Sequence, residues 1–137
     1  MRRRSDTVSF VGLGYVGLCT ATVFASKGIR VVGIDIDTER IQKLSSGIAP
    51  FHEPRLAPML KTAIKKKRIQ FTTDIQRLAD GQTTFMTVGT PSSKDGSINL
   101  SFVKKAAEEI GSTIRSAEGC AFGTNGLEIQ GSRSPLD

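Results

Sequence analysis

Three glycines at the spacing Gly-x-Gly-x-x-Gly, namely Gly12, Gly14 and Gly17, form the segment best suited to chemistry. They follow a run of β-forming residues, they open a helical pattern, and Asp35 comes about twenty residues later at the tip of a second predicted strand. In this context Gly12 permits a tight turn, Gly14 lets backbone N–H groups approach a pyrophosphate, and Gly17 lets the helix pack close to the strand. The N-terminus of that helix would offer the pyrophosphate unpaired donors and a positive partial charge. The pattern therefore predicts a dinucleotide site.

Asp35 determines which dinucleotide we expect. Its carboxylate is placed to accept hydrogen bonds from both hydroxyls of an adenosine ribose and would repel a 2′-phosphate, which favours NAD over NADP. Arg40 leaves alternatives open, because it could pair with a 2′-phosphate, stack on adenine, or pair with Asp35 or Asp37. Asp37 itself is expected to cap a helix rather than to bind a ligand. The intact Asp35 decides the prediction for NAD.

A second segment that could contact a cofactor is Gly89-Thr90-Pro91-Ser92, after the fourth predicted strand. Gly89 would allow close backbone approach, and the Thr90 hydroxyl could bond a cofactor ribose. An ordinary proline-containing turn explains the same residues. The spacing alone leaves both interpretations open.

The residues around these motifs alternate between strand and helix patterns. This alternation predicts an α/β fold of Rossmann type, a partial, doubly wound parallel sheet that binds NAD(P). Right-handed crossovers place the loops that follow the strands along one edge, with the first strand inside the sheet and parallel to the second. The expected strands are Thr7–Val11, Arg30–Asp35, Ile69–Thr72 and Thr83–Val88, and the expected helices are Tyr15–Lys27, Thr38–Ser45, Leu56 to the lysine run, a short helix capped by Asp74 through Leu78, and Leu100–Ile114.

The composition is that of an ordinary soluble domain. The chain has 137 residues, of which 38% are hydrophobic and 23% charged, and its length suits one domain or part of a larger one. The stretch Thr7–Ser26 contains too many glycines and polar residues for a membrane span. A basic leader, Arg2-Arg3-Arg4, imitates a signal peptide, but the glycines break the apolar region and no cleavage site follows. We therefore expect a cytoplasmic protein without a membrane partner.

Charge and cysteine usage argue against two further classes of function. The net charge of +6 is concentrated in Arg2–Arg4 and Lys65–Arg68. No aromatic residues interleave these cations, so we expect a solvated helix end rather than a nucleic-acid partner. Cys19, Cys120 and the single His52 have no metal-ligand spacing, so no metal site is expected. Cys19 is expected to be a buried small hydrophobe.

Several motifs in register resemble the UDP-glucose/GDP-mannose dehydrogenase family, in its N-terminal NAD-binding domain. The likeness covers about Val8 to Ile114 and looks strongest to the members that oxidise UDP-glucose. The matching segments are Gly12-Leu13-Gly14-Tyr15-Val16-Gly17-Leu18, Val32-Gly33-Ile34-Asp35-Ile36-Asp37, Glu53-Pro54 with Leu56, Thr72-Thr73-Asp74, Val88-Gly89-Thr90-Pro91-Ser92, and Asp95-Gly96 with Asn99-Leu100-Ser101.

The resemblance implies a two-step, NAD-dependent oxidation of a sugar C6 alcohol to a carboxylate, through an aldehyde held as a thiohemiacetal. It also implies a complete enzyme that takes a UDP-sugar and is a homo-oligomer. The loop Pro50–Leu56 would lie beside the cofactor cleft, and His52 has no role that carries over. By position, Gly14, Tyr15 and Val16 would lie under the pyrophosphate, Asp35 and Arg40 at the adenosine end, and Thr90 near the ribose on the nicotinamide side.

The sequence departs from the family pattern after about Arg115. The family continues there with a strand ending in Ser-Thr-Val, whereas residues 116–137 are rich in Gly and Ser and show no periodicity. We therefore expect an incomplete NAD-binding domain over residues 1–115 and a disordered, non-family tail over 116–137, as from a truncation, frameshift or misread gene end. The family's Gly-x-Cys segment is missing, and nothing basic near Cys120 would lower the pKa of its thiol.

The isolated chain is therefore expected to bind NAD without catalysing the oxidation, and no catalytic residue is assigned. Two alternatives stay open: another NAD-linked Rossmann dehydrogenase, or a non-catalytic nucleotide-binding fragment.

Overall fold

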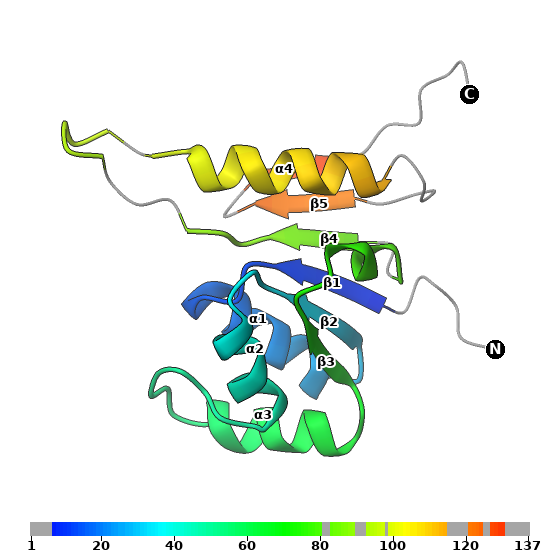
Figure 1. The fold of residues 1–137 in the computed structure, drawn as a ribbon. Coiled ribbons are helices and arrows are strands. Elements are labelled where there is room, and N and C mark those ends of the chain that lie inside the picture. The colour runs from blue at the N-terminus through cyan, green and yellow to red at the C-terminus, as the bar shows by residue number, and fades with distance from the viewer. Residues whose placement is uncertain are drawn as a thin grey trace.

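Six strands form one sheet in the order β3-β2-β1-β4-β5-β6 (Figure 1). The computed structural model describes residues 7–80, 83–89, 93–97, 99–114, 121–124 and 127–130. The strand β1 lies inside the sheet and pairs in parallel with both β2 and β4. This is the Rossmann strand order, as expected. The strands are β1 (Thr7–Val11), β2 (Arg30–Ile34), β3 (Ile69–Thr72), β4 (Thr83–Met86), β5 (Ala121–Thr124) and β6 (Leu127–Gln130).

The helices agree closely with the apolar periodicity of the sequence. They are α1 (Tyr15–Ser26), α2 (Thr38–Ser45), α3 (Leu56–Lys65), the 3₁₀ helix η2 (Ile75–Asp80) and α4 (Ser101–Ile114). Asp37 caps α2, as expected, because its Oδ1 accepts a hydrogen bond from the Arg40 backbone N–H at 3.1 Å. Gly28 follows α1 with φ 91°, a conformation that glycine adopts without steric cost.

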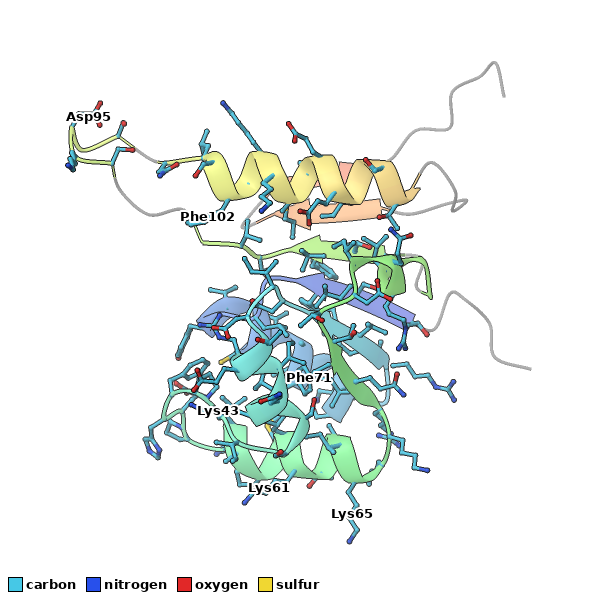
Figure 2. All side chains as sticks on the ribbon, in the orientation of Figure 1. Lys43, Lys61, Lys65, Phe71, Asp95 and Phe102 are labelled. Carbon is cyan, nitrogen blue, oxygen red and sulfur yellow. The ribbon has the colours of Figure 1, made fainter. Side chains whose placement is uncertain are left out.

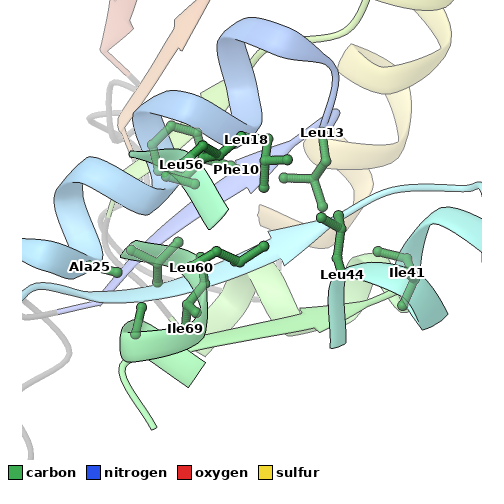
Figure 3. Close-up of a cluster of buried hydrophobic side chains, with 12 residues drawn as sticks. Phe10, Leu13, Leu18, Ala25, Ile41, Leu44, Leu56, Leu60 and Ile69 are labelled. Carbon is green, nitrogen blue, oxygen red and sulfur yellow. The ribbon is translucent and has the colours of Figure 1, made fainter. Parts of the chain in front are cut away.

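Each face of the sheet is covered by a different set of helices. Neighbouring residues of a strand point to opposite faces, so Phe10 and Val11 of β1 lie in different cores. The core that contains Phe10 packs against α1, α2 and α3 (Figure 3). The core that contains Val11 packs against η2 and α4, through Leu78, Ala106 and Ile110. Helices therefore cover both faces of the sheet.

Two strands, β5 and β6, lie within residues 116–137, where the sequence shows no strand periodicity. In this segment β5 pairs in parallel with β4, and β6 pairs antiparallel with β5. The backbone of β4 offers hydrogen-bond partners to β5. The side-chain pattern of residues 116–137 does not predict this pairing. One signal was present, because the residues between the paired Thr124 and Leu127 are Asn125 and Gly126, the dipeptide typical of two-residue hairpin turns.

The basic residues of α3 face away from the protein. Figure 2 shows Lys61 and Lys65 projecting outward from this helix, and Lys65, Lys66 and Lys67 are exposed. Within the ranges that the structure describes, no helix is long and apolar enough to cross a bilayer.

Candidate functional site

The glycine loop, residues 12–14, joins β1 to α1 at the edge of the sheet where the parallel strands end. The Gly12 N–H donates to the Ile34 carbonyl oxygen at 2.8 Å, so the loop is tied to the last residue of β2. Asp35 and Thr87 follow β2 and β4 directly at the same edge. The topology thus gathers the residues that the sequence places far apart.

The three glycines of the motif have different surroundings. A Cβ at Gly12, whose φ is 99°, would lie 2.8 Å from backbone atoms of Thr87 and Val88. A Cβ at Gly17 would overlap the Gly12 carbonyl oxygen and lie 2.5 Å from Thr87 Oγ1. A Cβ at Gly14 would have no neighbour within 4 Å. Gly12 and Gly17 are therefore required by protein packing, whereas Gly14 keeps a space open above the N-terminus of α1.

Thr87 is a site residue that the sequence reasoning missed. Its Oγ1 donates to the Gly12 carbonyl oxygen at 2.6 Å, and its backbone N–H donates to the Val11 carbonyl oxygen at 2.8 Å. The Thr87 side chain thus holds Gly12, the first residue of the glycine loop, against the end of β4. The contact follows from the register Val11↔Met86, which places the next residues, Gly12 and Thr87, side by side. No spacing in the sequence indicates that register.

Asp35 lies where expected, but the protein already uses its carboxylate. Oδ2 accepts from the Leu13 backbone N–H at 2.8 Å and Oδ1 accepts from the Asp37 backbone N–H at 3.0 Å. The side chain is only 9% exposed. Oδ1 can accept a second hydrogen bond, from a ribose hydroxyl. Oδ2 also lies 3.4 Å from Arg40 Nη1, so a second ribose hydroxyl would have to replace that contact. Asp35 is therefore both a brace of the glycine loop and a candidate for reading ribose.

Arg40 pairs with Asp35, which was one of the alternatives that the sequence left open. Its Nη1 lies 3.4 Å from Asp35 Oδ2, and its side chain is 36% exposed. The guanidinium therefore stands at the adenosine end of the predicted site. The pair is part-buried, and Arg40 is its more exposed partner.

Tyr15 and Val16, the first two residues of α1, are more than half exposed. The Tyr15 ring packs on Phe51 with centroids 4.9 Å apart, and its hydroxyl donates to Glu53 Oε2 at 2.5 Å. This hydrogen bond, together with the negative charge of Glu53, raises the pKa of Tyr15. The loop between α2 and α3 therefore lies against the first turn of α1.

Cys19 lies one helical turn after Tyr15 and is partly buried, rather than fully buried as expected. Burial first, and then the charge of Glu53, raises the pKa of its thiol. The thiol is therefore protonated at neutral pH and a poor nucleophile.

The remaining predicted contact, Thr90, lies outside the described residues, so its role stays a prediction. Gly89 precedes it, exposed, and has open space around its Cα. In the part of the chain that the structure describes, no three His, Cys, Asp or Glu side chains gather as they would around a metal ion.

The arrangement suits an anionic ligand with a ribose. The N-cap of α1 is Gly14, which provides no side-chain cap, and the first turn of α1 contains no acid. Its first N–H groups are therefore left for an anion, and the helix dipole favours negative charge there. The acid that could accept ribose hydroxyls stands at the end of the neighbouring strand β2. Both features fit a dinucleotide whose pyrophosphate lies over Gly14.

Comparisons with known proteins agree with this geometry. A family model described as "UDP-glucose/GDP-mannose dehydrogenase family, NAD binding domain" matches residues 6–120. The UDP-glucose 6-dehydrogenase of Pseudomonas aeruginosa is 41% identical over 108 residues, which are 78% of this chain and 24% of that protein. The GDP-mannose 6-dehydrogenase of the same organism is 35% identical over 109 residues, 79% of this chain and 25% of that protein. The chain thus spans about a quarter of the length of these relatives.

Solved structures show the same likeness. A GDP-mannose dehydrogenase from Pseudomonas aeruginosa, determined as a ternary complex, superposes with a TM-score of 0.82 at 31% identity, over 88% of this chain and 28% of that one. A UDP-glucose dehydrogenase from Pyrobaculum islandicum superposes with a TM-score of 0.81 at 33% identity, over 89% of this chain and 29% of that one.

Proposed function

The chain belongs to the UDP-glucose/GDP-mannose dehydrogenase family, and we propose that it serves as the NAD-binding part of an enzyme that oxidises a nucleotide sugar at C6. In the complete enzyme one UDP-glucose, two NAD and water would give UDP-glucuronate and two NADH. The observation that carries the proposal is the uncapped start of α1, with open space over Gly14 and Asp35 beside it. When bound, NAD supplies the acceptor for the hydride.

The residues of this chain would bind and orient the cofactor. The backbone N–H groups of Tyr15 and Val16 would donate to the pyrophosphate. Asp35 would accept from the adenosine ribose and disfavour a 2′-phosphate, while Arg40 would line the adenosine end. We assign Thr90 to the ribose on the nicotinamide side, which its position directly after the exposed Gly89 supports.

We propose a UDP-sugar as the substrate of the complete enzyme. The identity to a UDP-glucose 6-dehydrogenase, 41%, exceeds the 35% to a GDP-mannose 6-dehydrogenase from the same organism, which supports this choice. We also propose that this chain alone does not oxidise UDP-glucose, because the thiol of Cys19 is protonated and partly buried.

We place the boundary of the NAD-binding domain near residue 115. The family model supports a boundary in this region because its match ends at residue 120. The strands β5 and β6 begin after the family match ends, and the proposal treats them as an addition to the sheet of this domain.

Calorimetric titration with NAD and with NADP tests the proposed function. The wild-type chain should bind NAD more tightly than NADP. Asp35→Ala should weaken NAD binding by about 1–3 kcal/mol, the value of charge-assisted hydrogen bonds. It should weaken NADP binding far less, because the repulsive carboxylate disappears with it. Lys43→Ala, which breaks the exposed ion pair with Glu39, is a control that should change neither affinity.

Three results would contradict parts of the proposal. A wild-type chain that binds neither dinucleotide is not a cofactor domain. Equal losses for NAD and NADP in Asp35→Ala would mean that Asp35 only braces the Leu13 N–H. Formation of NADH from UDP-glucose by this chain, abolished by Cys120→Ala, would refute the proposal that the chain alone is inactive.

A further inference from the structure

The helix α1 begins without a support of its own. Its N-cap residue is Gly14, which has no side chain, and its first turn contains no acid. The first N–H groups of a helix have no partner within the helix, so a first turn without a cap opens easily. In a cofactor site these donors must nevertheless hold a fixed direction, because they are the groups that meet the pyrophosphate.

A neighbouring loop supplies the support that α1 lacks. Tyr15, the first residue of α1, stacks on Phe51 and donates to Glu53, both of which belong to the loop between α2 and α3. The ring contact and the hydrogen bond act on the same side chain from two residues of one loop. The side chain is nevertheless 56% exposed, so these contacts, and not burial, hold it.

The loop that holds Tyr15 is itself anchored. The Leu56 N–H donates to the Glu53 carbonyl oxygen at 3.1 Å, and the Leu56 side chain is only 4% exposed in the core. Phe51 is partly buried and packs against the same core. The contacts of Tyr15 therefore connect the first turn of α1 to the interior of the protein.

We infer that Tyr15 is a positioning residue for the cofactor, whose side chain, held by Phe51 and Glu53, keeps the first backbone N–H groups of α1 aimed at the pyrophosphate. The inference rests on the proposed function, since it takes NAD to lie over Gly14. It assigns the side chain a role separate from the backbone contact of Tyr15. Without the contacts of Tyr15 with Phe51 and Glu53, the first turn of α1 would have to become ordered each time the cofactor binds. The entropy lost in that ordering would weaken pyrophosphate binding.

The composition of the chain makes the Tyr15–Glu53 pair directly observable. The sequence contains one tyrosine and no tryptophan, so ultraviolet absorbance of the phenolate reports Tyr15 alone. The hydrogen bond raises the pKa of Tyr15, and the titration midpoint should therefore lie above about 10, the ordinary value. The pair stabilises the fold below about pH 10, and this contribution is lost as the pH rises through the raised pKa. Glu53→Ala should return the midpoint toward the ordinary value, whereas Glu108→Ala, at an exposed carboxylate of α4, should leave it unchanged.

The role in binding is tested with Tyr15→Phe, which keeps the ring and removes the hydroxyl. The affinities for NAD and ADP-ribose should fall about threefold to tenfold, equivalent to one hydrogen bond. The affinity for adenosine, which has no pyrophosphate, should stay within about twofold as measured by NMR titration. In a Glu53→Ala background the Tyr15→Phe loss should disappear, because the carboxylate that held the hydroxyl is gone.

The outcomes separate the inference from the proposed function. Wild-type protein that binds no ADP-ribose refutes the proposed function and the inference together. Equal affinity of wild type and Tyr15→Phe for ADP-ribose refutes the inference alone. An equal loss for adenosine would also overturn it, because the hydroxyl would then support the fold in general. A midpoint at about 10 that Glu53→Ala does not move would show that the pair is absent.

Discussion

The inner and outer sides of the glycine loop differ in what requires glycine there. On the inner side, Gly12 and Gly17 lie so close to Thr87 that an added Cβ would meet protein atoms at 2.8 Å or less. On the outer side, Gly14 faces open space. One sequence motif thus combines a packing requirement with a ligand requirement. The spacing of the glycines does not reveal which glycine packing requires and which a ligand requires. Substitutions on the inner side should lower stability, and a substitution on the outer side should lower ligand affinity.

The largest effect is expected on the inner side. Gly17→Ala should destabilise the protein by about 3 kcal/mol, because the new methyl overlaps backbone that cannot move aside. Gly111→Ala is the matched control, since Gly111 lies in α4 and a Cβ there would have no neighbour within 4 Å. That control should instead stabilise by about 0.5–1 kcal/mol through helix propensity. Urea unfolding measures the free energy of unfolding of both variants. Similar free energies for Gly17→Ala and Gly111→Ala would show that packing does not require glycine on the inner side.

The outer side should respond in binding and not in stability. Gly14→Ala fills the space over the first turn of α1, where backbone must approach the pyrophosphate. We expect NAD affinity to fall by about tenfold or more, or about 1.4 kcal/mol. The free energy of unfolding should stay within about 0.5 kcal/mol of wild type. If Gly14→Ala lost stability but kept its affinity for NAD, Gly14 would be required by packing and not by the ligand.

The smallest effect is expected at Thr87, the residue after β4 that holds the glycine loop by a hydrogen bond to Gly12. Thr87→Val keeps the shape of the side chain and removes the hydroxyl that donates to the Gly12 carbonyl oxygen. A loss of about 1 kcal/mol in unfolding free energy is expected, the net value of one hydrogen bond. Thr87→Ser retains the donor and should lose less. Equal losses in both variants would attribute the effect to the methyl group.

The sequence predicted the architecture well because its signals were local. Strand and helix patterns, together with right-handed crossovers, were sufficient for the order β3-β2-β1-β4. The predicted strands ran slightly long, since β2 ends at Ile34 and β4 at Met86. The strands β5 and β6 were missed because residues 116–137 show no side-chain periodicity, whereas β5 is held between β4 and β6 by backbone pairing.

The site was predicted less completely, for a related reason. The glycines and Asp35 belong to a motif with fixed spacing, and the structure places them together. Thr87 and Glu53 act through single contacts across the fold, and no spacing in the sequence announces these contacts. Asp35 illustrates the limit as well: its position followed from the sequence, but its hydrogen bonds to Leu13 and Asp37 did not.

The central place of β1 has a consequence for the order of folding. Its partner β2 is the next strand along the chain, whereas Val11 and Thr87, which meet beyond β4, are 76 residues apart. Closing the longer loop costs about 1 kcal/mol more than closing one near 20 residues. The unit β1–α1–β2 should therefore assemble first, and β4 should dock onto it afterwards. Pulse-labelled hydrogen exchange would show this as earlier protection of amides in β2 than in β4, and simultaneous protection would exclude it.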